Sequence, residues 1–157
     1  MLGREHAIGH PALTDRSTGL ANRLHFELVY SYLFEAGDRG VSLSVMLISI
    51  PNAVEVEADV EQLRSIGERV QDTTRMADLA AHLGHGRFIV LLLGANLQGA
   101  RIAADRLENA LRDVGVVDLS IGLTMYQNEM KQSSELLEKA DKALRAAEAA
   151  GGGIEIL

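Results

Sequence analysis

Four stretches of the chain repeat apolar residues every three or four positions, which is the pattern of a helix with one buried face. These predicted helices begin near Thr18, Val54, Leu97 and Ser133. They end before Gly37, at Thr73, at Asp113 and before Gly151. In the first helix, the stripe predicted to face inward is Leu20, Leu24, Leu28 and Tyr32, widened by Phe26, Val29 and Leu33. The second is predicted as one continuous helix whose inward stripe is Val56, Val60, Leu63, Ile66 and Val70.

Shorter stretches between the helices have the residue pattern of strands, at 41–49, 77–83, 87–93, 117–124 and 154–157. The first and third are apolar on both faces, which predicts central strands. The fourth alternates apolar and polar residues, which predicts a half-buried strand, and the last is predicted at an edge. Glycines on either side of His85 predict a tight hairpin between the second and third strands. This order predicts an α/β sandwich with a βαββαβ core, a centrally placed hairpin and helices covering the sheet.

Length and composition limit the classes of function. A chain of 157 residues corresponds to one domain, and we assign residues 1–14, which show no periodicity, to an N-terminal leader and residues 15–157 to the domain. The 15 Lys and Arg against 22 Asp and Glu give a net charge of −7, which argues against a nucleic-acid partner. The absence of Cys excludes disulfides and thiolate metal sites. No apolar run is long enough for a bilayer and no signal peptide is visible, so we expect a cytoplasmic protein without a membrane partner.

Two segments resemble signature segments of the GGDEF (diguanylate cyclase) family. Residues 15–23, DRSTGLANR, followed by Phe26, are similar to the family's opening D-x-L-T-G-L-x-N-R-x-x-F. Ser17 in place of Leu is the only departure there. The predicted hairpin turn lies where the family carries G-G-D-E-F, and the residues of this chain at those positions are Gly84, His85, Gly86, Arg87 and Phe88.

Two later segments follow in the family's order and spacing. LSIGL at 119–123 resembles the family's V-S-I-G-V strand. ELL at 135–137 and ADKAL at 140–144 resemble its E-L-L…A-D-x-A-L helix. The resemblance covers nearly the whole chain, and it implies a nucleotidyl-cyclase-like α+β fold with a central mixed, mainly antiparallel sheet covered by helices.

The resemblance implies an activity, the condensation of two GTP molecules into cyclic di-GMP. That reaction needs divalent cations, which bind carboxylate oxygens. The resemblance places one metal carboxylate at the end of the first strand, where this chain has Ser49-Ile50-Pro51 instead of D-x-D, and the other at Arg87. A fixed cation at a ligand position repels Mg²⁺. The second glycine of the turn, which would let the nucleotide approach the backbone, is replaced by His85.

The family's base-reading and phosphate-binding residues are also replaced. Its polar segment after the first strand, with a guanine-reading Asn and Asp, has no counterpart, because Pro51 leads almost directly into the next predicted helix. The family's phosphate-binding Lys and Arg correspond to Glu148 and Gly152. We therefore predict a degenerate member that is not an enzyme, with no catalytic residue, no metal and no cofactor.

One ligand-binding feature of the family is retained. Arg75-Met76-Ala77-Asp78 matches R-x-x-D at the family's inhibitory-site spacing before the turn, where Arg and Asp hold a guanine of cyclic di-GMP. A guanidinium donates in a fork to guanine O6 and N7 or to phosphate oxygens. Arg75 and Asp78 are therefore the candidate ligand-binding residues. The alternative is an ordinary surface ion pair, with Arg75 at a helix C-terminus.

Two histidines on either side of the turn, His82 and His85, are candidate metal ligands. A zinc site needs more ligands than these two, and none is evident in the sequence, so we predict solvated histidines and no metal. We expect Arg87 to pair with an Asp or Glu of a neighbouring element.

Three functions from different classes follow. The favoured one is an inactive GGDEF-like domain that regulates or interacts with a protein partner in cyclic di-GMP signalling. The second is a receptor of cyclic di-GMP, or of a guanine nucleotide, through Arg75 and Asp78. The third, which we favour least, is an active cyclase with unconventional residues.

Overall fold

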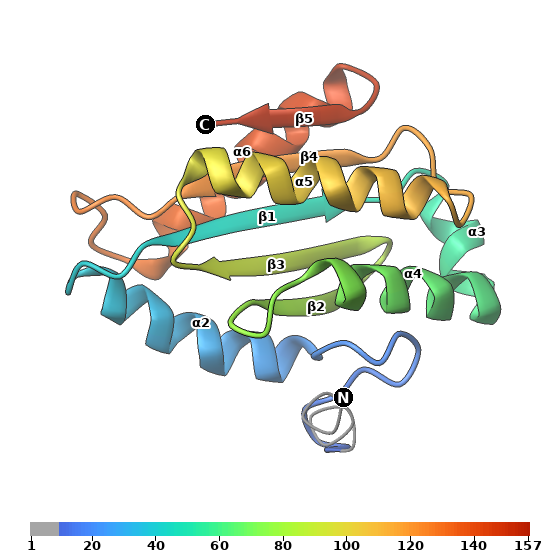
Figure 1. Cartoon of the computed structure of the whole chain (residues 1–157), viewed down its shortest axis with the longest axis horizontal. Helices are drawn as coiled ribbons and strands as arrows, with labels where there is room; N and C mark the ends of the chain where they lie inside the picture. The colour runs from blue at the N-terminus through green and yellow to red at the C-terminus, as the bar shows by residue number, and fades with distance from the viewer. Residues whose placement is uncertain (1–9) are drawn as a thin grey trace.

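A single sheet forms the centre of the computed structural model, which describes residues 10–157 (Figure 1). Its strands are β1 (Leu43–Ser49), β2 (Leu79–Gly84), β3 (Arg87–Leu93), β4 (Ser120–Met125) and β5 (Gly153–Ile156). The helices are α2 (Arg23–Gly37), α3 (Ala53–Ala58), α4 (Val60–Thr73), α5 (Leu97–Arg112) and α6 (Ser133–Ala149). The strand order is β2-β3-β1-β4-β5, and only β4 and β5 are parallel neighbours. The predicted α+β fold with a βαββαβ core and a mixed, mainly antiparallel sheet is confirmed.

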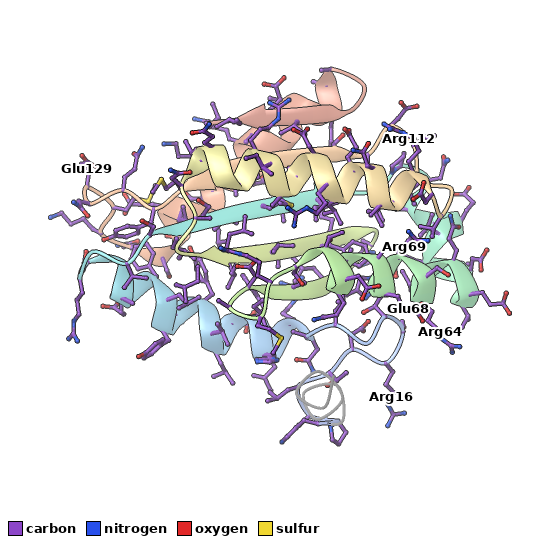
Figure 2. All side chains as sticks on the ribbon, viewed as in Figure 1. Arg16, Arg64, Glu68, Arg69, Arg112 and Glu129 are labelled. Atoms are coloured by element: carbon purple, nitrogen blue, oxygen red, sulfur yellow. The ribbon has the colours of Figure 1, made fainter. Side chains whose placement is uncertain are left out.

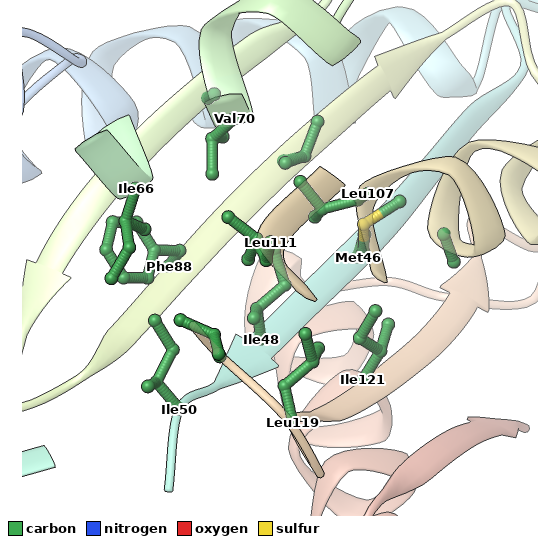
Figure 3. Packing of buried hydrophobic residues seen from close by; sticks show 14 of the residues in the cluster. Met46, Ile48, Ile50, Ile66, Val70, Phe88, Leu107, Leu111, Leu119 and Ile121 are labelled. Atoms are coloured by element: carbon green, nitrogen blue, oxygen red, sulfur yellow. The ribbon is translucent and has the colours of Figure 1, made fainter. Parts of the chain in front are cut away.

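The sheet lies between two pairs of helices, and each pair closes an apolar core. Charged side chains such as Arg64 and Glu68 of α4 project away from the sheet (Figure 2). The core under α4 and α5 includes Met46, Ile66, Phe88, Leu107 and Ile121 (Figure 3). The core under α2 and α6 includes Phe26, Tyr30, Leu47, Ile89 and Leu144. Because helices cover both faces, nearly all residues of β1, β3 and β4 are buried whichever way they point.

The positions of two strands differ from the prediction. β1 and β3 are central, as expected, but β2 is an edge strand, so the hairpin is not centrally placed. The segment before α2 lies against the outer side of β2, where Ala21 forms a β-bridge with Ala81. β4 was expected to be half-buried, yet residues 120–124 are all buried, because α6 packs on its polar face. Gly122 permits this approach, since a Cβ built there would lie 2.4 Å from the backbone nitrogen of Leu144.

The first helix begins at Arg23 and not near Thr18. The residues before it form a loop, in which the Thr18 hydroxyl donates to Asp15 Oδ2 at 2.7 Å. Asn22 is the N-cap, and its side chain accepts a hydrogen bond from the backbone N–H of His25. Side chains that cap in this way favour a helix start at the following residue.

The main row of the predicted inward stripe of this helix is wrong, whereas Phe26, Val29 and Leu33, which were predicted to widen it, do belong to the core side. Leu20 is buried in the loop before the helix, whereas the other three members of that row are exposed, namely Leu24, Leu28 and Tyr32. The residues that face the sheet are Phe26, Tyr30 and Phe34. Two rows with a period of four run along α2, and the aromatic row buries the larger area.

The second predicted helix is two helices, separated at Asp59. The backbone of Asp59 is extended (φ −97°, ψ 100°), and its side chain caps α4 by accepting from the N–H of Gln62. Val60 is consequently exposed, although it was predicted to face inward. The buried residues of α3 and α4 are Val56, Leu63, Ile66, Gly67 and Val70.

The C-terminal elements agree with the prediction, including α6 and the edge strand β5. Residues 1–9 of the predicted leader lie outside the described residues. Of the rest, Leu13 accepts a hydrogen bond from the N–H of Asn22, and Ala12 accepts one from its side chain. Within residues 10–157, no helix has the length and apolar character required to cross a membrane.

Candidate functional site

The hairpin between β2 and β3 is a two-residue turn of His85 and Gly86. Both have positive φ, 53° and 72°, which is the conformation of a type I′ turn. Gly86 is also required by space, since a Cβ there would lie 2.6 Å from the Cβ of Ala53. The N–H of Ile50 donates to the carbonyl of Gly86 at 2.9 Å. The start of α3 therefore lies directly against the turn.

The end of β1 and the start of β3 bring Ser49 and Arg87 opposite each other. Arg87 Nη1 donates to Asp141 Oδ1 of α6 at 3.4 Å, and the carboxylate of Asp141 also accepts from Arg145. Ser49 Oγ donates to Glu148 Oε2 at 3.0 Å. The expectation that Arg87 pairs with an acidic residue of a neighbouring element is confirmed.

A buried histidine joins three segments beside the turn. His82 is 8% exposed, with Nδ1 2.9 Å from Asp15 Oδ2 and Nε2 2.8 Å from Glu57 Oε2. The same Glu57 oxygen accepts from the backbone N–H of Gly86 at 2.8 Å. The imidazole also packs on Phe88, with ring centroids 4.8 Å apart. This histidine therefore links the loop before α2, the helix α3 and the turn.

Each ring nitrogen of His82 faces a carboxylate oxygen of another segment. The expectation of a solvated histidine is wrong for His82 and confirmed for His85, which is exposed at the tip. Within residues 10–157, no group of three or more His, Asp or Glu side chains is arranged to hold a metal ion.

Arg75 and Asp78, the predicted ligand-binding pair, lie next to each other and bind each other. Arg75 Nε and Nη2 donate to the two carboxylate oxygens of Asp78 at 3.1 and 3.0 Å, and the Arg75 backbone N–H donates at 3.1 Å. These hydrogen bonds to the Asp78 carboxylate, together with its negative charge, raise the pKa of the Arg75 guanidinium. The side chain of Asp78 is only 2% exposed, whereas that of Arg75 is 55% exposed. Arg75 is thus the only member of the pair that is open to a ligand.

A cavity of about 350 Å³ adjoins this pair. Arg75, which lines the cavity, also donates from Nη2 to the carbonyl of Leu93 at 2.9 Å. A second guanidinium, that of Arg106, lines the cavity from α5, together with Asn96 at the start of that helix. The sequence did not indicate Arg106 or Asn96, because they are about 20 to 30 residues beyond the R-x-x-D segment and share no motif with it.

A family model described as diguanylate cyclase, GGDEF domain, matches residues 12–153. The chain belongs to the GGDEF family. Diguanylate cyclase A of Treponema denticola is 26% identical over 136 residues, which are 76% of this chain and 37% of that protein. The cyclic di-GMP phosphodiesterase NbdA of Pseudomonas aeruginosa is 27% identical over 165 residues, covering 96% of this chain and 21% of that protein. This GGDEF domain therefore spans well under half the length of either relative.

Solved GGDEF domains have the same fold. That of DgcB from Caulobacter crescentus, in complex with cyclic di-GMP, has a TM-score of 0.84 at 17% identity and covers 94% of this chain and 96% of its own. The GGDEF domain of YfiN from Pseudomonas aeruginosa has a TM-score of 0.75 at 27% identity, and the match covers 91% of this chain and 93% of that one. The family and its relatives place this GGDEF domain in cyclic di-GMP signalling.

The acidic residues around the signature turn were not predicted. In this GGDEF domain, Asp15 and Glu57 lie 67 and 25 residues from His82 in sequence, and no spacing rule connects them. Asp15 was assigned only to the family's opening segment. Glu57 belongs to a stretch that the sequence predicted as the polar side of a longer helix.

Proposed function

We propose that this GGDEF domain is catalytically inactive and acts as a regulatory or protein-interaction module in cyclic di-GMP signalling. The observation that carries the proposal is the pairing of Ser49 with Arg87 at the end of the sheet. The family resemblance places one metal carboxylate in the segment Ser49-Ile50-Pro51 and the other at Arg87. A hydroxyl and a guanidinium supply no anionic ligand to Mg²⁺, and the guanidinium repels it.

The neighbouring carboxylates do not replace the missing ligands. Asp141 accepts hydrogen bonds from Arg87 and Arg145, so its charge is balanced by two cations. Glu148 is bound to Ser49, at the position the family resemblance assigns to a phosphate-binding cation. A triphosphate at this edge of the sheet would therefore meet a carboxylate, which repels it.

The close contact of α3 with the turn supports the same proposal. Ala53 leaves no room for a methyl group on Gly86, and Glu57 occupies the N–H of Gly86. The resemblance implies that a nucleotide would approach the backbone of this turn. In this domain Ala53 and Glu57 already contact that backbone. This arrangement follows from the short connection after Pro51, which has no room for the family's polar base-reading segment.

Incubation of the domain with GTP and Mg²⁺ tests the proposal. We expect chromatography to detect no cyclic di-GMP above a protein-free blank. The variant with both Ser49→Asp and Arg87→Glu is the matched control, and we expect it to be inactive too, because the base-reading segment is still missing. Formation of cyclic di-GMP by the unsubstituted domain would contradict the proposal.

A second candidate function, binding of cyclic di-GMP, is favoured by the cavity beside Arg75. Two guanidinium groups, Arg75 and Arg106, line it, and guanidinium groups bind phosphate and the guanine edge. The hydrogen bonds of Asp78 count against this function. Both of its carboxylate oxygens already accept from Arg75, so a guanine N–H would have to displace Arg75.

Isothermal titration with cyclic di-GMP separates this candidate from the first. If the cavity is a receptor site, Arg75→Ala weakens binding by about tenfold or more, which corresponds to the loss of one charge-assisted contact. The matched control is Arg69→Ala, whose exposed side chain on α4 pairs with Asp113 and does not line the cavity. No heat at about 1 mM ligand would eliminate the receptor function.

A regulatory role requires a protein partner. The diguanylate cyclase SiaD of Pseudomonas aeruginosa has been solved in complex with its activator SiaC, and its fold matches this chain with a TM-score of 0.84. We infer that this domain likewise acts through a protein partner, and not through nucleic acid or a membrane. Its cytoplasmic location stays a prediction.

A further inference from the structure

The turn of His85 and Gly86 is joined to α3 through one carboxylate. Glu57 Oε2 accepts from the backbone N–H of Gly86 at 2.8 Å and lies 2.8 Å from Nε2 of His82. Nδ1 of the same ring lies 2.9 Å from Asp15 Oδ2, in the loop before α2. The imidazole is only 8% exposed. The attachment of α3 to the turn therefore depends on a buried titratable ring.

Both contacts of this ring are hydrogen bonds only when a proton lies in each of them. That proton is carried either by the ring nitrogen or by the carboxyl group, and a neutral imidazole supplies just one. When the second proton leaves, one nitrogen turns its lone pair toward a carboxylate oxygen 2.8 or 2.9 Å away. Two acceptors at such a distance repel each other, so one of the two carboxylates must move.

The charged groups of the neighbouring elements are directed elsewhere. The guanidinium of Arg23 on α2 donates to a backbone carbonyl of β2 at 3.2 Å. On β3, Phe88 packs on the ring, and Arg87 pairs with a carboxylate of α6. On α4, which closes the core around Phe88, the side chains of Arg64 and Glu68 project away from the sheet (Figure 2). The second proton is therefore shared by the ring and its two carboxylates.

The loop that carries Asp15 is fixed in place. Asp15 Oδ2 also accepts from the N–H and the hydroxyl of Thr18, at 3.1 and 2.7 Å. Thr18 is buried, and a Cβ built on Gly67 of α4 would lie 2.2 Å from its carbonyl oxygen, so the loop packs directly on the backbone of α4. Asp15 consequently keeps its position and two of its donors when the proton leaves.

The helix α3 is held less firmly than this loop. It has six residues, of which Val56 is buried. Asn52 before it has a left-handed backbone (φ 57°), and Asp59 after it is extended, so neither end is continuous with another helix. Short segments with few buried contacts open at a low cost in free energy. Glu57, which α3 carries, is therefore the carboxylate that moves.

We propose that His82, Asp15 and Glu57 form a proton-dependent clamp, which holds α3 on the turn at low pH and releases it as the pH rises. The closed clamp requires one proton more than the released one, so acid favours closure and alkali favours release. Release frees the N–H of Gly86 and moves Ala53 away from the turn. The surface that a protein partner meets beside the turn thus changes with pH.

An NMR titration of the nucleotide-free domain from about pH 5 to about pH 9 tests the proposal. We expect the ring signals of His82 and the amide signals of Gly86 and residues 53–58 to change along one common curve. The Gly86 amide should also lose protection against hydrogen exchange by about tenfold or more, after correction for the intrinsic pH dependence of exchange. This factor corresponds to the loss of one hydrogen bond to a charged group.

The variant Glu57→Gln isolates the clamp. Its amide carries protons of its own and donates to a neutral ring nitrogen, so α3 should stay on the turn and the protection of Gly86 should be constant across the titration. Glu55→Gln is the matched control, because it removes the same charge from an exposed position of α3 and should keep the original pH dependence. Circular dichroism verifies that both variants fold.

Four results would overturn the proposal. They are a His82 ring that keeps one protonation state throughout, a ring that titrates while Gly86 and α3 do not respond, protection that rises with pH, and a Glu57→Gln variant with the original pH dependence. The first three come from the unsubstituted domain, so the test does not require that the variant folds. Because no nucleotide is present, the outcome is also independent of whether the domain turns over GTP.

Discussion

The His82→Ala variant is expected to lose about 2–3 kcal/mol of unfolding free energy, since it removes a buried ring that contacts two carboxylates and packs on Phe88. Asp15 and Glu57 both direct carboxylate oxygens at the imidazole, and their side chains are only 23% and 25% exposed. Without the ring, these carboxylates lose their shared partner, and Phe88 loses its neighbour. Urea unfolding followed by circular dichroism measures the loss.

The matched control is the other histidine of the turn. His85 is exposed and has positive φ, a conformation that Asn tolerates well, so His85→Asn is expected to change stability by no more than about 0.5 kcal/mol. Equal losses in the two variants would show that the contacts of His82 do not stabilise the fold. A loss confined to His82→Ala would support its role in holding α3 against the turn.

The Gly122→Ala variant is expected to lose about 3 kcal/mol or more, because overpacking against backbone cannot be relieved by a side-chain rotation. A Cβ at this position would lie 2.4 Å from the Leu144 nitrogen and 2.7 Å from the Ala140 carbonyl oxygen. The variant must push α6 away from β4. Thermal unfolding measures the loss, and α6 should show the greatest increase in amide exchange.

Gly99→Ala is the matched control for the loss of a glycine. A Cβ at Gly99 meets nothing nearer than 3.5 Å, and this position in α5 is helical. Alanine is favoured over glycine in a helix by up to about 1 kcal/mol, so this variant should be as stable as the original or more so. An unchanged stability in Gly122→Ala would contradict the packing of α6 on β4 described above.

The order of helices and strands was predictable because the spacing of apolar residues and the residue types in the turns specify each element locally. The strand at 87–93 is apolar at nearly every position, and the glycines around His85 are compatible with a two-residue turn, so the hairpin follows from the sequence. The error in α2 has a physical cause as well. Its sequence contains two apolar rows, and which of them is buried depends on the sheet it packs against.

The site was predictable only where a family motif covers it. Arg75, Asp78 and Arg87 were found in this way, and the structure shows the partner of each. Glu57 was not found, because its role depends on the break at Asp59, where a single extended residue ends one helix and caps the next. Contacts between residues distant in sequence carry no local pattern.

The proposed inactivity is tested most directly by measuring whether Mg²⁺ and GTP bind at the Ser49–Arg87 edge of the sheet. Amide NMR spectra are recorded while GTP with excess Mg²⁺ is added to about 1 mM. We predict that the amide signals of Ser49, Gly86 and Arg87 do not move, because that edge has a guanidinium where the metal requires carboxylates. Saturable shifts of these three signals that disappear when Mg²⁺ is chelated would contradict the proposed inactivity.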